Sequence, residues 1–332
     1  MKYLFLSQRN GLVPFAYYFA RRGLDVDLVV WKGTHEASLA GLPGGPNRPE
    51  VERQSAGGLP IHETLDRYRE LEPGSLTVVT DLPSAHRVLG EGPRYFDTNG
   101  EPLDNGIQVG GWWSGGRLRL EHLLVVDVGA WTGGMGPRID GGMSLVWPVQ
   151  TPDLAPLQAQ LAPLLGGFTG LVRFELSPGE GGLEVGRLQL GWTPLHTHLF
   201  LAELEGSQSL LEGSGEAKPR ARFLTAVPVS VPPWPNPGRG AEGHPIQLTE
   251  QQLSQFFWHD ARRGEGKQLV TAGLDGLVGV AVGSALNPLG ARLKALALAE
   301  ALDLPEKQFR ADAGARVPEV VAAFEEQFGV VL

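Results

Sequence analysis

The sequence of 332 residues predicts an α/β protein with more than one domain. Over roughly the first hundred residues, strand-length apolar runs alternate with helix-spaced ones, which is typical of a parallel sheet with helical crossovers. From residue 107 the predicted strands become rich in aromatic residues and glycine, and capped helices follow in the C-terminal part. We therefore predict three domains, over residues 1–100, 101–237 and 238–332.

The N-terminal part shows the alternation most clearly. Phe15, Phe19 and Ala20 follow Pro14 at helical spacing, and Gly23 ends this pattern. Strands are predicted over residues 3–7, 24–31 and 76–80, a long loop over 32–60, and a short amphipathic helix through Leu65, Tyr68 and Leu71. This order predicts a small Rossmann-like domain.

The central part is predicted to begin with antiparallel hairpins that contain Trp112, Trp113 and residues 118–120 and 123–128, followed by a turn at 132–136. Residues 171–176 and 183–190 are predicted as a further strand pair. Thr151 and Pro152 are a cap and a first-turn proline. They open a predicted helix with the apolar face Leu154, Leu157, Leu161 and Leu164.

A linker to the C-terminal part is predicted at residues 228–243, which hold five prolines and three glycines. Thr249 and Gln252 form a capping box, and Asn287 with Pro288 opens a helix that runs to about Leu302. Between these signals, a hairpin is predicted over residues 268–271 and 277–282, and a last helix over 318–328.

Composition excludes several classes of protein. With 28 basic and 37 acidic residues, the net charge is -9, which argues against a nucleic-acid partner. No cysteine is present, so disulfides, thiolate zinc sites and cysteine nucleophiles are excluded. No apolar run reaches the roughly 18 residues of a membrane span, and the first ten residues lack a signal-peptide cleavage region, so no membrane association and a cytoplasmic location are expected.

A glycine-rich loop is the strongest candidate site. The sequence DVGAWTGGMG begins at Asp127, and consecutive glycines allow backbone amides to approach an anion. Asp127 could receive an amine or a ribose hydroxyl. This interpretation implies a small anionic or sugar-phosphate ligand, and a purely structural turn remains the alternative.

Five short motifs, in order, resemble those of one family. DVGAWTGGMG and the RADAG that begins at Arg310 are similar to D-x-G-P-N-T-G-G-M-G and R-x-D-I-G of glycinamide ribonucleotide synthetase, the ATP-grasp ligase of purine biosynthesis. WWSGG at Trp112, GHPI at Gly243 and LVTAG at Leu269 fall in the matching order. The resemblance implies a Rossmann-like domain, a reduced ATP-grasp core and a C-terminal α/β domain. It also implies substrate-binding roles for Asp127, Thr132, Gly133, Gly134, Gly136, Arg310 and Asp312.

The chain departs from this family where ATP would bind. The family's lid subdomain, with its phosphate-facing lysine, precedes the W-F-N-G turn, whereas here only residues 100–106 separate Asn99 from Ile107. Residues 33–217 contain no lysine, although a general preference for arginine would have the same effect. The family's metal motif E-F-N-x-R-F-G corresponds to residues 183–192, which keep Glu184 but lack the asparagine. Glu184 is therefore a weak metal candidate and otherwise an exposed carboxylate.

Three further patterns are weaker. His196 and His198 have the spacing of metal ligands only on an extended strand, and no third ligand is evident. Arg310 and Asp312 are predicted to stabilise the C-terminal domain rather than to perform chemistry. GRGAEG at residues 238–243 matches G-x-G-x-x-G but follows no strand, so we interpret it as a false positive.

Two functions remain open. The chain is either a catalytically silent relative, a pseudoenzyme that binds a small ligand or a protein partner and needs no cofactor, or an active carboxylate-amine ligase. An active ligase would use ATP and magnesium to form an acyl phosphate, and a partner chain would have to supply a lid. The missing lid and lysine favour the silent relative.

Overall fold

The computed structural model describes residues 2–7, 12–20, 22–30, 51–55, 76–80, 94–97, 107–148, 155–165, 168–179, 182–190, 193–212, 217–236, 238–264 and 268–328. The predicted helix through Leu65, Tyr68 and Leu71, the cap at Thr151 and the short connection at residues 100–106 lie outside these ranges.

The N-terminal part forms a parallel sheet, as predicted. Its strands lie in the order β3 (Val51–Ser55), β2 (Asp25–Val30), β1 (Lys2–Ser7), β4 (Leu76–Thr80) and β5 (Arg94–Asp97), and every neighbouring pair is parallel. Helix α1 (Val13–Ala20) packs against it and ends before Gly23, whose positive φ of 84° suits glycine. The loop predicted over residues 32–60 is corrected at 51–55, because this polar segment forms edge strand β3.

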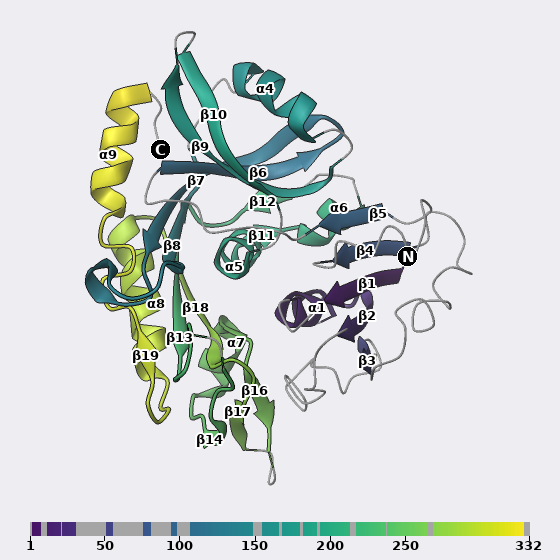
Figure 1. Cartoon of the computed structure of the whole chain (residues 1–332), viewed down its shortest axis with the longest axis vertical. Coiled ribbons are helices and arrows are strands. Elements are labelled where there is room, and N and C mark those ends of the chain that lie inside the picture. The colour runs from purple at the N-terminus through teal and green to yellow at the C-terminus, as the bar shows by residue number, and fades with distance from the viewer. Residues whose placement is uncertain are drawn as a thin grey trace.

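A nine-stranded antiparallel sheet forms the centre of the molecule (Figure 1). The hairpin of β6 and β7 and the pair of β9 and β10 confirm the strand pairs predicted for this part. In order across the sheet, the strands are β10 (Gly182–Leu190), β9 (Gly170–Gly179), β6 (Ile107–Ser114), β7 (Arg117–Val128), β8 (Asp140–Val146), β13 (Phe223–Ser230), β18 (Leu277–Ala285) and β15 (Phe256–Trp258), with β19 (Gln308–Phe309) beside β13.

Helices cover both faces of this sheet. Helix α4 (Ala155–Leu165) lies over β9 and β10, while α8 (Pro288–Ala301) and α9 (Val317–Phe328) lie along the outer face (Figure 1). On the other face, α5 (Pro194–Ala202) lies between the sheet and α1. The predicted apolar face of α4 is corrected at one position: Leu165 is buried with Leu157 and Leu161, while Leu164 is 62% exposed.

Smaller elements connect these layers. They are η1 (Thr132–Gly134), β11 (Leu204–Glu205), α6 (Ser207–Glu212), β12 (Lys218–Pro219) and α7 (Glu250–Gln255). The capping box of α7 is present, with the Thr249 side chain accepting from the Gln252 amide, and the Asn287 side chain caps α8 by accepting from Gly290.

The predicted linker at residues 228–243 is wrong at both ends. Residues 228–230 continue β13, a central strand of the large sheet, and 242–243 begin β14 (Glu242–Pro245). Because β18 and β15 follow this segment and complete the sheet, strands from both sides of residue 237 share one sheet. The apolar character of Val227, Val229 and Val231 outweighs the proline content.

The predicted hairpin over residues 268–271 and 277–282 is also wrong. Strand β17 (Leu269–Ala272) pairs with β14 and with β16 (Ala261–Arg263), whereas β18 joins the large sheet. The buried carboxylate of Asp260 lies at this change of sheet, where it accepts hydrogen bonds from the amide of Ala272 at the end of β17 and from those of Leu274 and Gly276 in the connection to β18. These bonds stabilise the chain where it leaves one sheet and enters the other.

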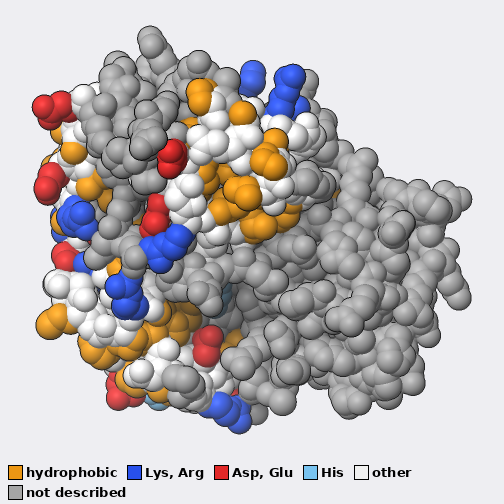
Figure 2. All heavy atoms as spheres, turned by 45° about the horizontal axis from the view of Figure 1, so that its top comes forward, with side chains coloured by type: hydrophobic (Ala, Val, Ile, Leu, Met, Phe, Trp, Pro, Cys, Tyr) orange, Lys and Arg blue, Asp and Glu red, His pale blue; other side chains and the backbone are white. Residues whose placement is uncertain are grey.

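The described surface carries both charges. On the face shown in Figure 2, Lys and Arg side chains are interspersed with Asp and Glu rather than gathered in one area. Within the described ranges, no helix is long and apolar enough to cross a membrane.

Candidate functional site

The glycine-rich loop follows the end of β7 and is closed by its own backbone. Trp131 and Met135 face each other across a bridge, and Gly134 donates its amide to the Trp131 carbonyl. Gly129 has a φ of 103°, and a Cβ there would lie 2.6 Å from the Gly134 carbonyl oxygen. The loop therefore requires glycine at this position to fold back on itself.

The segment that begins at Arg310 packs directly on this loop. The guanidinium of Arg310 donates to the carbonyl oxygens of Val128 and Gly129, both at 3.0 Å, and holds Asp312 at 2.7 Å through Nε. Asp312 in turn accepts the Gly133 amide at 2.9 Å. Burial tends to raise the pKa of Asp312, but the hydrogen bonds from Arg310 and Gly133 hold it below its ordinary value.

Asp127 and Thr132 complete the junction. Asp127 is buried and accepts the Gly314 amide at 2.7 Å through Oδ2, while Thr132 accepts the Ala311 amide at 3.3 Å through Oγ1. Burial raises the pKa of Asp127 above its ordinary value, against the opposing effect of the Gly314 hydrogen bond. The side chain of Asp127 is thus committed to the C-terminal segment rather than open to solvent.

The structure brings the predicted substrate-binding residues together although about 180 positions separate them along the chain. Gly133 and Arg310 both donate to Asp312, while Asp127 and Thr132 accept the amides of Gly314 and Ala311 in the same C-terminal segment. Gly134 and Gly136 lie in the same loop, and a Cβ at Gly136 would lie 2.6 Å from the Trp131 ring. We call the seven predicted substrate-binding residues the loop junction. Its hydrogen bonds fit the predicted stabilising role of Arg310 and Asp312, and its role in binding stays a prediction.

Glu184 lies elsewhere. It is exposed on β10, opposite Ser177 of β9. Among the described residues, no three His, Asp or Glu side chains converge in a way that would hold a metal ion. The structure therefore offers no ligand set around Glu184.

His196 and His198 are on helix α5, not on a strand, so their side chains point in different directions. His196 meets His122 of β7, with 2.8 Å between the two Nε2 atoms, and His198 meets His259, with 2.9 Å between theirs. The Nδ1–H of His122 donates to the Leu120 carbonyl, so in the neutral pair His196 must be the Nε2–H donor. We call these the two histidine pairs.

The first pair requires a glycine beneath it. A Cβ at Gly110 would lie 2.4 Å from Nε2 of His122 and 3.0 Å from Nε2 of His196. Burial lowers the pKa of His122 to about 4 and that of His259 to about 3, and it lowers the pKa values of His196 and His198 well below their ordinary value. Both pairs are therefore neutral and structural at pH 7.

Acid is expected to destabilise the protein through these pairs. Between pH 6.5 and 4 the unfolded chain binds more protons at these histidines than the folded chain, so the free energy of unfolding falls as the pH falls. For His122 alone, the shift to about 4 corresponds to a loss of about 3 kcal/mol by pH 4. Urea unfolding at pH 7, 5.5 and 4 measures this loss. A His122→Gln, His196→Gln double variant should lose less stability over this range, and an equal loss would contradict the assignment.

One buried charge was missed by sequence reasoning. Arg173 of β9 is buried, pairs with Asp140 at 2.9 Å and donates through Nε to Gln189 of β10. The signal was an arginine at the centre of the apolar strand LVRFEL, where only a partnered charge is tolerated. This cluster ties β8, β9 and β10 together on the face of the sheet that also carries His122.

No family model and no curated protein matches the sequence. Solved structures do match. The phosphoribosylamine–glycine ligase of Thermotoga maritima aligns with 94% of this chain and 100% of its own, with a TM-score of 0.61 and 14% identity. The L-amino acid ligase of Bacillus licheniformis aligns with 92% of this chain and 98% of its own, with a TM-score of 0.50 and 16% identity. The urea carboxylase of Kluyveromyces lactis aligns with 99% of this chain and 32% of its own, with a TM-score of 0.52 and 8% identity. The chain thus has an ATP-grasp ligase fold, as the motifs predicted.

Proposed function

We propose that this chain, which shares the fold of phosphoribosylamine–glycine ligase, is a catalytically silent relative that binds a ligand or protein partner at the loop junction. The observation that supports this is the position of Asp312. Its carboxylate receives the Gly133 amide and the Arg310 guanidinium, the two kinds of donor that would hold an anionic substrate at such a loop. In the described structure these two donors are therefore used by the protein itself.

Four other loop amides are also used within the protein. Hydrogen bonds from the amides of Gly129, Ala130, Trp131 and Gly134 go to carbonyl oxygens of the same loop or its flanks. A phosphate or carboxylate ligand that bound through these amides or that of Gly133 would therefore have to displace Asp312 or open the loop. This cost disfavours a phosphate-binding role for the loop.

The outer side of the loop offers apolar contact instead. Trp131 is 42% exposed and Met135 is 64% exposed, and they lie side by side. Tryptophan is enriched among the residues that contribute most to protein–protein binding. We therefore favour a protein partner over a sugar phosphate as the occupant.

The alternative is an active ligase, which would place the chain in purine biosynthesis or a related reaction. The convergence of the predicted substrate residues on one junction favours it. Such an enzyme needs ATP with magnesium, yet the exposed Glu184 has no converging carboxylates among the described residues. The described residues therefore do not fit a magnesium site.

Binding of magnesium ATP distinguishes the two. We expect no saturable heat in calorimetric titration of the full chain with magnesium ATP, relative to a magnesium-only control, and no ADP release with mixtures of amino acids and amines. A ligand at about 100 times its dissociation constant would stabilise the folded state by about 2.7 kcal/mol, so thermal unfolding gives a second measure. Magnesium-dependent binding in the micromolar range, or ADP release, would restore the ligase.

A further inference from the structure

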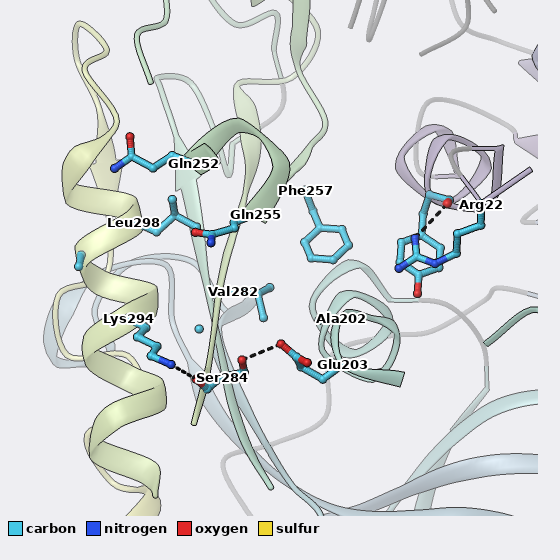
Figure 3. Close-up of a pocket in the computed structure, with 13 residues that line it drawn as sticks. Arg22, Ala202, Glu203, Gln252, Gln255, Phe257, Val282, Ser284, Lys294 and Leu298 are labelled. Carbon is cyan, nitrogen blue, oxygen red and sulfur yellow. Dashed lines mark hydrogen bonds between the residues drawn. The ribbon is translucent and has the colours of Figure 1, made fainter. Parts of the chain in front are cut away.

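A cavity lies apart from the loop junction and shares no residue with it. It has a volume of about 560 Å³ and opens between α1, α5, α7, β18 and α8 (Figure 3). It lies beside β18 just beyond Ala281, the last β18 residue paired with β15. Its size is within the roughly 300 to 1,000 Å³ typical of small-molecule sites.

Two opposite charges lie on one side of this cavity, anchored to the same residue. Glu203, at the end of α5, accepts the Ser284 hydroxyl at 2.7 Å through Oε1, and Lys294 of α8 donates to the Ser284 carbonyl at 2.8 Å (Figure 3). Within the described ranges, neither charge forms an ion pair. Each therefore keeps hydrogen-bonding capacity, which for Glu203 includes its second carboxylate oxygen.

Apolar side chains form a wall of this cavity. Phe257 and Val282 lie on its α1 side, and Leu298 of α8 lies on the side away from α1 (Figure 3). Phe257 packs against His198, with 4.3 Å between the ring centroids, and makes a stacked contact with Tyr18. The histidine pair of His198 and His259 thus packs against Phe257 of this wall through the His198 ring. A ligand would meet an aromatic surface that is already positioned, which lowers the entropic cost of binding.

We propose that this cavity binds a free α-amino acid with a large apolar side chain. Its carboxylate would meet Lys294, its ammonium group would meet the free oxygen of Glu203, and its side chain would pack on Phe257, Val282 and Leu298. A zwitterion places a charge of opposite sign on each of these two side chains, whereas a ligand with one charge meets only one of them. The apolar wall favours an amino acid whose own side chain is large and apolar.

Calorimetric titration of the full chain with L-phenylalanine tests the proposal, with N-acetyl-L-phenylalanine and L-phenylalanine amide as ligands that lack the ammonium and carboxylate charges. Glu203→Gln keeps an acceptor for Ser284, and it should weaken binding of L-phenylalanine and its amide by about tenfold or more while leaving the N-acetyl ligand unaffected. Lys294→Met should weaken the binding of L-phenylalanine and of N-acetyl-L-phenylalanine, but not that of L-phenylalanine amide.

Glu205→Gln is the matched control, because Glu205 lies two residues from Glu203 but is exposed in a surface pair with Arg220. It should leave all three affinities unchanged. Absence of saturable binding of L-phenylalanine, L-leucine and L-methionine at millimolar concentration would overturn the proposal, as would binding that Glu203→Gln and Lys294→Met leave intact. These titrations contain no nucleotide and involve no residue of the loop junction, so their failure is distinct from failure of the proposed function.

Discussion

Replacing Asp260 by alanine is expected to lower the free energy of unfolding by about 4 to 6 kcal/mol. The carboxylate is fully buried and accepts the amides of Ala272, Leu274 and Gly276. Alanine leaves these amides without an acceptor in a place that water does not reach. Burial raises the pKa of Asp260, against the opposing effect of these hydrogen bonds.

Urea unfolding at pH 7 measures this effect. Asp275→Ala is a suitable control, because the Asp275 carboxylate is exposed and accepts one nearby amide, that of Leu277. The Asp275→Ala variant should lower the free energy of unfolding by about 1 kcal/mol. If Asp260→Ala unfolds within about 1 kcal/mol of the wild type, the connection between β17 and β18 does not depend on this carboxylate.

Replacing Arg310 by methionine should lower the free energy of unfolding by about 3 to 5 kcal/mol. The Arg310 side chain is 6% exposed and satisfies two backbone carbonyls of the glycine-rich loop, whereas Asp312 is 33% exposed and can turn to water. Removing the guanidinium removes the hydrogen bonds that the carbonyls of Val128 and Gly129 accept from Arg310. Asp312→Ala should therefore cost less, about 1 to 2 kcal/mol.

Thermal unfolding combined with amide hydrogen exchange checks this order. The Gly133 and Gly134 amides should exchange faster in both variants, because the loop loses its contact with the C-terminal segment. Arg220→Met, which removes an exposed pair, should change stability by less than about 1 kcal/mol. Unchanged melting of Arg310→Met, together with altered partner binding, would instead assign Arg310 to recognition.

Much of the local structure could be predicted from the sequence. The alternation of apolar runs indicated the parallel sheet around β1, and the caps at Thr249 and Asn287 marked where α7 and α8 begin, because capping depends on residues within one turn. The glycine-rich loop and the RADAG segment are recognisable as motifs, and together they contain all seven residues of the loop junction.

The histidines show where local pattern fails. The run from Leu195 to Leu201 is apolar enough for a buried strand or a buried helix, and periodicity alone does not separate the two. The cap position of Thr193 with Pro194 was a helix signal that the spacing of His196 and His198 obscured.

The sequence by itself determined the type of most elements and the motifs of the loop junction, since these depend on neighbours along the chain. Only the tertiary structure decided which strands share a sheet, which histidines meet, and that Asp312 fills the loop. The His122–His196 pair joins residues 74 positions apart, and the Tyr18 hydroxyl donates to the Leu201 carbonyl from 183 positions away. Such contacts depend on how layers pack and on which buried polar groups find a partner, and no local pattern encodes that choice.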